Sequence, residues 1–119
     1  MNLPALGAAA ITVVNDIAFD SQNNLWLATE EGVWKYDGTN WTNWTSSNSA
    51  IVHNHVSSIV INKNDSVFVS SYNAQGTFYG GISIYNGTNW TTFTIANSDL
   101  PSEQIDDMEL DTLGNLWIN

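Results

Sequence analysis

The side chains best suited to acid–base chemistry are carboxylates in adjacent pairs, Glu30-Glu31 and Asp106-Asp107. Two carboxylates can share the proton transfers of a hydrolysis when both face the same bond. Neighbours along a β-strand point to opposite faces of the sheet, so neither pair converges on one bond. The sequence also offers no nucleophile–base–orienter set and no phosphate-binding glycine loop. We therefore expect a protein without catalytic residues of its own.

His53 and His55 form the one imidazole pair of the chain, and cysteine is absent. The absence of cysteine excludes thiolate chemistry and a disulfide framework. Residues two positions apart share a face in an extended segment, so both imidazoles could bind one metal ion such as zinc. No third ligand is evident near them in the sequence. We treat the two histidines as weak metal candidates and expect neither a metal nor another cofactor.

Charge and composition restrict the elements that could position a site. Twelve acidic residues oppose two basic ones, Lys35 and Lys63, and the net charge is −10. Such a chain would repel phosphate backbones and anionic lipids, which argues against nucleic-acid binding and membrane-surface roles. The apolar stretch at residues 3–14 is too short to span a membrane. Asn, Thr and Ser are abundant, a composition common on secreted β proteins, so we expect a periplasmic or secreted bacterial protein without membrane insertion, in which residues 1–12 are a leader or linker.

An internal repeat accounts for most of the chain. An apolar strand that ends in Asp or Asn occurs at residues 14–20, 56–62 and 105–111, and an Asn-Trp-Thr segment follows at 37–45 and again at 86–94. Each unit contains four short apolar runs separated by turn residues, among them a hairpin signal of the Asp-Gly type. Four strands per unit, at a spacing of roughly 40–45 residues, are typical of a β-propeller.

We therefore predict an all-β fold, a β-propeller fragment with two complete four-stranded antiparallel blades and the first two strands of a third. The expected boundaries are residues 13–53 for blade 1, 54–103 for blade 2 and 104–119 for half of blade 3. Trp26, Phe68 and Trp117 occupy the same place in the three units. An aromatic residue that returns in every blade favours packing between blades, so we expect all three to be buried.

Several motifs resemble the two-component regulator propeller repeat. The best copies are Asp111-Thr-Leu-Gly-Asn-Leu-Trp117 and Asn97-Ser-Asp-Leu-Pro101, and the resemblance covers nearly everything from Val14 to Asn119. It implies a sensor or ligand-binding propeller, as in periplasmic regions of hybrid histidine kinases and in secreted bacterial proteins. The chain departs from the fuller architecture because it has no kinase and few blades, so the resemblance does not imply signalling through a kinase here.

Antiparallel topology predicts where a ligand would bind. The connections from the second to the third strand, and from the fourth strand to the next blade, share one end of the blades, which we call the loop-rich face. The longer connection of blade 2 carries aromatic and amide side chains, namely Tyr72, Asn73, Gln75, Phe78 and Tyr79. This combination suits a sugar or a peptide, and loops on a rigid scaffold often carry binding residues. The structural alternative is a plain β-ribbon whose aromatics pack on one another.

The first strand of each blade lies innermost in a propeller, so its first residues line the channel mouth. Asp16, Ser58 and Asp107 hold equivalent positions there. Such a polar ring could bind water, a cation or a polar ligand, and a solvated channel wall is the alternative reading.

The sequence thus predicts a non-catalytic recognition or sensor-type module that binds a small ligand, a glycan or a partner protein on its loop-rich face. A fragment of a propeller lyase or hydrolase, with catalytic residues on missing blades, is one alternative, and a structural or surface-display repeat is another. Two and a half blades leave apolar faces open. We expect self-association, with a homodimer of six blade positions favoured, or the remainder of a longer propeller, and residues 3–11 could cover an exposed edge.

Overall fold

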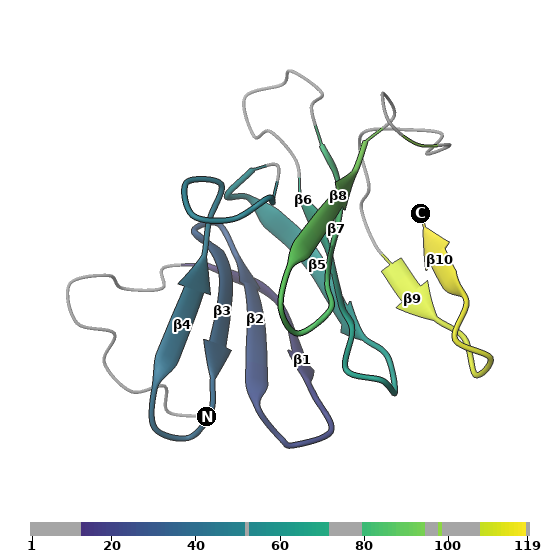
Figure 1. Ribbon diagram of the computed structural model, residues 1–119, viewed down its shortest axis with the longest axis horizontal. Helices are drawn as coiled ribbons and strands as arrows, with labels where there is room; N and C mark the ends of the chain where they lie inside the picture. Colours follow the sequence, from purple (N-terminus) through teal and green to yellow (C-terminus); the bar gives the residue numbers. More distant parts are fainter. Residues whose placement is uncertain (1–12, 52, 72–79, 95–97, 99–107, 119) are drawn as a thin grey trace.

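The computed structural model describes residues 13–51, 53–71, 80–94, 98 and 108–118. These residues form ten β-strands (Figure 1), namely β1 (Val14–Phe19), β2 (Leu25–Thr29), β3 (Gly32–Tyr36), β4 (Trp41–Trp44), β5 (Val56–Ile61), β6 (Val67–Ser71), β7 (Gly81–Tyr85), β8 (Trp90–Phe93), β9 (Met108–Leu110) and β10 (Leu116–Ile118). The described part of the chain contains no helix, and therefore none long and apolar enough to cross a membrane.

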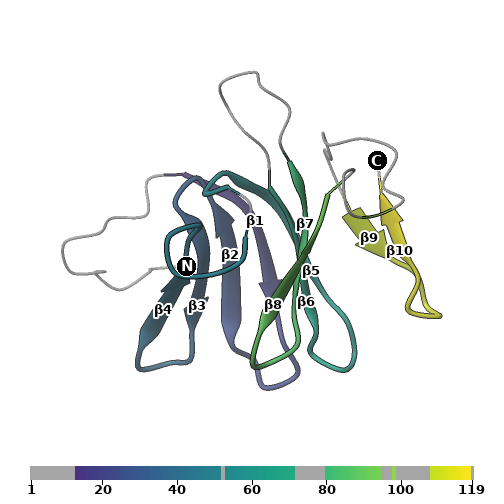
Figure 2. The ribbon, with the colours of Figure 1, turned by 45° about the horizontal axis from the view of Figure 1, so that its top comes forward.

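The strands form three antiparallel sheets in chain order, β1-β2-β3-β4, β5-β6-β7-β8 and β9-β10. The sheets stand side by side like the blades of a fan (Figures 1 and 2), and the first strands β1, β5 and β9 contact one another in succession. This arrangement confirms the predicted all-β fold of two four-stranded blades and two strands of a third. We call β1–β4 blade 1, β5–β8 blade 2 and β9–β10 the third sheet.

The turn after each first strand is stabilised by a carboxylate or amide at its first position. In blade 1, Asp20 accepts hydrogen bonds from the backbone N–H groups of Gln22 and Asn24, and its second oxygen accepts from Trp26 Nε1 at 3.0 Å. Asp111 repeats the same bonds in the third sheet, including one from Trp117 Nε1 at 2.9 Å. We call this contact between the turn carboxylate and the indole the Asp–Trp clasp.

Blade 2 contains a matched replacement of the clasp. Asn62 takes the place of the aspartate and still accepts from the backbone N–H groups of Asn64 and Ser66. Phe68 takes the place of the tryptophan and has no N–H group to donate. Both partners of the clasp are therefore replaced in blade 2, the carboxylate by an amide and the indole by a phenyl ring. The second carboxylate oxygen is needed only where an indole donates to it.

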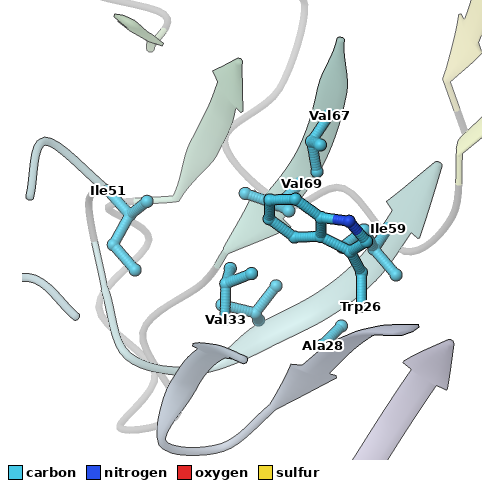
Figure 3. Packing of buried hydrophobic residues seen from close by; sticks show 8 residues of the cluster. Trp26, Ala28, Val33, Ile51, Ile59, Val67 and Val69 are labelled. Carbon is cyan, nitrogen blue, oxygen red and sulfur yellow. The ribbon is translucent and has the colours of Figure 1, made fainter. Parts of the chain in front are cut away.

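The main core lies between blades 1 and 2 (Figure 3). Trp26 is 3% exposed, and the ring stacks on Trp44 of its own blade with centroids 5.3 Å apart. Blade 2 covers Trp26 with Tyr85 and with the buried side chains Ile59, Val67 and Val69. Side chains alternate along each strand, so Leu25 and Leu27 belong to a separate cluster on the other face of blade 1.

Exposure of the recurring aromatic residue depends on whether another sheet covers it. Phe68 is half-buried between blade 2 and the third sheet, where it packs against the cluster of Ile82 and Met108. Trp117 is 64% exposed, although its clasp matches that of Trp26. The prediction that all three residues are buried is therefore wrong for Trp117. Among the described residues, no further sheet covers this side of the third sheet.

Two equivalent glycines allow the third and fourth strands to approach closely. A Cβ atom on Gly32 would lie 2.1 Å from the carbonyl oxygen of Trp44, and φ at Gly32 is +93°. A Cβ atom on Gly81 would lie 2.5 Å from the carbonyl oxygen of Phe93. Gly32 and Gly81 hold the same place in the two blades, and close backbone contact across the β3–β4 and β7–β8 pairs explains why both are glycine.

Candidate functional site

The predicted aromatic and amide cluster on the loop-rich face, Tyr72, Asn73, Gln75, Phe78 and Tyr79, lies outside the described residues. Asp107 of the predicted channel ring also lies outside them, as does the segment 3–11. Asp16, Ser58, His53 and His55 are described, and all four lie near the loop-rich ends of the strands.

Asp16 and Ser58 are brought together across the boundary between blades. Asp16 Oδ2 accepts hydrogen bonds from the backbone N–H of Ile59 at 3.0 Å and from Ser58 Oγ at 3.5 Å. The other oxygen, Oδ1, accepts from the N–H of Ile17 at 2.9 Å. Ser58 is buried, whereas Asp16 keeps partial exposure. These contacts give both residues a demonstrable part in joining β1 to β5, and a ligand would reach Asp16 before Ser58.

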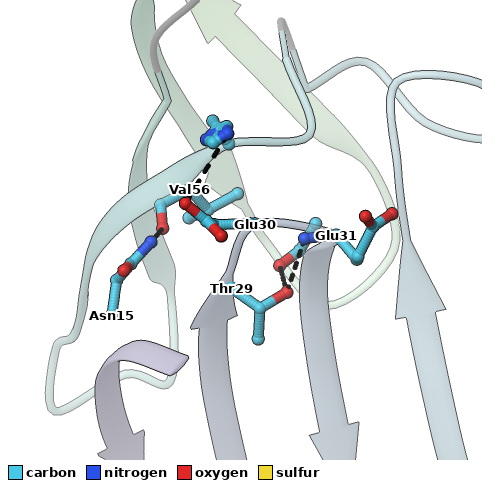
Figure 4. A network of polar contacts seen from close by, with 7 residues as sticks. Asn15, Thr29, Glu30, Glu31 and Val56 are labelled. Atoms are coloured by element: carbon cyan, nitrogen blue, oxygen red, sulfur yellow. Dashed lines mark hydrogen bonds and ion pairs between the residues drawn. The ribbon is translucent and has the colours of Figure 1, made fainter. Parts of the chain in front are cut away.

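A β-bulge recurs at this point of both blades. The pairing register shifts between Val14 and Asp16 in β1, and between Val56 and Ser58 in β5. A bulge leaves one residue unpaired and re-aims its side chain. In blade 1 that residue is Asn15, whose Nδ2 donates to the carbonyl oxygen of Val56 at 3.0 Å (Figure 4). The bulge therefore supplies a second tie between the blades beside Asp16.

The β2–β3 turn completes the polar network in Figure 4. Thr29 Oγ1 donates to the carbonyl oxygen of Gly32 at 2.8 Å and accepts from the N–H of Glu31 at 3.0 Å. Glu30 Oε1 lies 3.7 Å from His55 Nε2, so the carboxylate of blade 1 faces an imidazole that precedes β5. Glu31 remains exposed. The adjacent carboxylates thus have separate surroundings and do not converge on a common point.

The two histidines of the predicted metal pair have different surroundings. His55 contacts Glu30, and His53 Nε2 is buried without a hydrogen-bond partner. No group of three His, Asp or Glu side chains gathers in the part of the chain that the structure describes. The contact between Glu30 and His55 joins two blades and was not foreseen from the sequence.

The opposite end of the blades, which we call the turn face, carries a second inter-blade contact. Ser21 in the β1–β2 turn donates its N–H to Asp65 Oδ1 at 2.9 Å, and its hydroxyl donates to Asp65 Oδ2. Asp65 lies in the β5–β6 turn with φ +63°, a left-handed conformation that Asp tolerates. We call this pair the turn latch.

At the next boundary a cleft takes the place of the latch. An open cleft of about 380 Å³ lies between the β5–β6 and β9–β10 turns, lined by Ile61, Asn62, Lys63, Asn64, Leu110, Asp111, Thr112, Leu113 and Gly114. Lys63 holds the repeat position of Ser21, and Gly114 holds that of Asp65. Sequence reasoning missed this cleft. A comparison of these two positions between repeats was the signal that could have found it.

The turn carboxylates owe their lowered pKa values to hydrogen bonds. Donation from Trp117 and then from Asn115 lowers the pKa of Asp111 to about 2. Partial burial acts to raise the pKa of Asp20, but bonds from Trp26 and Asn24 outweigh it and the pKa falls. The backbone N–H groups of Asn40 and Thr39 lower the pKa of Asp37. These groups are anionic hydrogen-bond acceptors at neutral pH, which suits turn stabilisation and gives them no proton to donate in catalysis.

Comparison with known proteins supports the repeat assignment. The family model described as two component regulator propeller matches residues 10–31. A solved structure, titled as the "extracellular domain of the putative hybrid two component system" from B. thetaiotaomicron, aligns with a TM-score of 0.72 at 21% sequence identity. The alignment covers 88% of this chain and 14% of that chain. No curated protein matches the chain.

The chain therefore spans a small part of the solved extracellular domain that it resembles. Four-stranded antiparallel sheets that share a line of first strands, together with this structural match, establish the fold. The chain has the β-propeller fold over two blades and two strands of a third, and its resemblance to the two-component regulator propeller repeat is confirmed.

Proposed function

We propose that this chain is a recognition module of an exported, sensor-type β-propeller, and that it binds a small ligand, a glycan or a partner protein on its loop-rich face. The observation that carries the proposal is the set of inter-blade ties at that face. Asn15, Asp16 and Glu30 of blade 1 each reach a group in or just before β5. Ties of this kind hold the blade ends rigidly, and a rigid scaffold is what a binding loop requires.

The comparisons support the same proposal at a coarser level. The match to the regulator propeller model favours a sensor module, and the extracellular domain named in the solved structure favours export of this chain. The described residues bring no nucleophile, base and orienting group together, which favours recognition over hydrolysis or lyase chemistry.

A glycan array probed with the full chain, run beside a screen for hydrolase and lyase products, tests this proposal. We expect selective retention of a ligand without product release. Glu31→Arg places a bulky charge on the loop-rich face and should abolish retention, whereas Thr39→Arg places the same charge on the exposed turn face and should not. Product release would support the enzyme alternative, and equal loss in both variants would contradict binding on the loop-rich face.

We further propose that a second copy of the chain covers the apolar side chains left open at the two outer sheets. Ile17 and Phe19 on β1 are 50% and 52% exposed. Ile59 and Met108 hold the position of Ile17 in the second and third units, and both are buried against a neighbouring sheet. Trp117 is exposed on the other side. One chain thus offers both halves of the kind of interface that joins blades 1 and 2.

Light scattering over a concentration series tests the assembly. We expect a dimer in which Trp117→Glu promotes dissociation, while Thr39→Glu, on an exposed turn, leaves the mass unchanged. A stable, folded monomer at micromolar concentration would contradict self-association and would favour further blades of a longer chain as the covering surface.

A further inference from the structure

We infer that the cleft between blade 2 and the third sheet binds a small organic carboxylate, held by Lys63. The cleft lies on the turn face, away from the loop-rich face of the proposed function, so the two sites are independent. The argument begins from the turn latch, because the chain itself shows there how a turn of this shape binds a carboxylate.

The latch defines the binding geometry. The first turn presents a backbone N–H and a side-chain donor at Ser21, and the Asp65 carboxylate accepts both. Each carboxylate oxygen thus receives one hydrogen bond, which is a favourable arrangement for a charged acceptor. No other described residue is needed to complete the contact.

The equivalent positions in the cleft keep the donors and lose the acceptor. Lys63 retains the backbone N–H of Ser21 and replaces its hydroxyl with an ammonium group. Gly114 replaces Asp65 and has no side chain, and nothing lies within 4 Å of the point where its Cβ would be. A carboxylate from a ligand would fill the space that the Asp65 side chain fills at the neighbouring boundary.

Charge also favours Lys63 as the anion-binding group. The chain has two basic residues, and the other one, Lys35, lies over the ring of Trp26 at 5.3 Å from its centroid. Within the described residues, neither the ammonium nor the backbone N–H of Lys63 has a hydrogen-bond or ion-pair partner. Lys63 is therefore available to a ligand.

One carboxylate, Asp111, also lines the cleft and must be weighed against an anionic ligand. Its two oxygens are engaged by the N–H groups of Leu113 and Asn115, the Asn115 amide and the Trp117 indole. These four hydrogen bonds occupy both oxygens and stabilise the negative charge of Asp111, whereas the charge of Lys63 has no partner among the described residues. The net charge of −10 acts over longer range and is screened at physiological salt.

The remaining lining indicates what the carboxylate is attached to. Ile61, Leu110 and Leu113 provide apolar surface, and the cleft volume of about 380 Å³ exceeds what a carboxylate alone would fill. A volume of this size lies in the usual range for small-molecule sites. We expect a carboxylic acid with a short branched or linear apolar chain.

The test is a titration of the ¹⁵N-labelled full chain, at physiological salt, with isovalerate and with isovaleramide, its uncharged analogue of similar shape. Isovalerate should shift the Lys63 backbone amide resonance saturably, and isovaleramide should bind at least about ten-fold more weakly. Lys63→Met should weaken isovalerate binding at least about ten-fold, whereas Lys35→Met removes the same charge elsewhere and should change affinity less than two-fold.

Gly114→Asp provides the decisive variant, because it rebuilds the turn latch. Aspartate is compatible with this position, since Asp65 adopts the same left-handed conformation at its counterpart. In this variant the Lys63 amide should be shifted before any ligand is added, and isovalerate binding should be lost. Equal binding of acid and amide, equal effects of the two lysine variants, or unchanged affinity in Gly114→Asp would each overturn the inference.

Discussion

The Asp–Trp clasp permits a quantitative test of how the blades are stabilised. Trp26→Ala removes a side chain that packs between Trp44 and blade 2 at a residue that is 3% exposed. Loss of a buried tryptophan leaves a cavity and costs about 3–5 kcal/mol of unfolding free energy. Trp117→Ala removes the same residue type from a largely exposed site and should cost about 1 kcal/mol or less.

The hydrogen bond of the clasp can be separated from the packing of the ring. Trp26→Phe keeps an aromatic ring but deletes the Nε1 bond to Asp20, and a hydrogen bond to a charged group contributes about 1.5–3 kcal/mol. The upper part of that range requires burial, and Asp20 is partly exposed, so we expect about 1.5 kcal/mol. Asp20→Asn with Trp26→Phe recreates the pair found in blade 2, Asn62 with Phe68.

Urea denaturation of the two single variants and the double variant gives the coupling free energy. We expect the double variant to be more stable than the sum of the single effects by about 1 kcal/mol. Additive effects would show that the indole and the carboxylate act independently, and an equal cost for Trp26→Ala and Trp117→Ala would refute the burial argument.

Three further outcomes follow from the turns. The pKa of Asp111 in the folded chain is about 2, below its ordinary value of 3.8. The ionised carboxylate therefore stabilises the fold at pH values above 3.8, and this contribution is lost as the pH falls toward 2. Trp117→Phe should raise that pKa, as read by NMR titration of the carboxyl carbon. Gly32→Ala should cost at least about 3 kcal/mol in denaturation, whereas Gly87→Ala, with positive φ but no neighbour within 4 Å of the Cβ, should cost about 1 kcal/mol. Asp65→Ala should cost about 1 kcal/mol, since the turn latch is exposed, and no change in the midpoint would show that the latch is not formed in solution.

Much of the fold was predictable because the repeat is local chemistry. Alternating apolar residues, the Asp or Asn at the start of a turn and the Asp-Gly hairpin signal each act within one hairpin, so the sequence predicts the strand order directly. The clasp is equally local, since Asp20 and Trp26 are six positions apart. It was overlooked because the recurring tryptophan was interpreted through packing alone.

Contacts between blades could not be predicted in the same way. The exposure of Trp117, the contact of Glu30 with His55 and the tie between Asp16 and the N–H of Ile59 all depend on which sheet lies against which. Sequence periodicity specifies the faces of a strand and leaves their partners open. A comparison of repeats shows that Lys63 and Gly114 replace Ser21 and Asp65, but which turns face each other depends on how the sheets pack.

The Asp–Trp clasp has a consequence for how such chains change over evolution. Asp111 holds the indole of Trp117 in place even though that ring is largely exposed. The hairpin therefore holds its tryptophan in place without contact from a neighbouring blade, and a duplicated unit would already carry the residue that packs against the next blade. After gain or loss of a whole unit, substitutions at positions such as 63 and 114 are enough to replace a turn latch between two blades with a cleft.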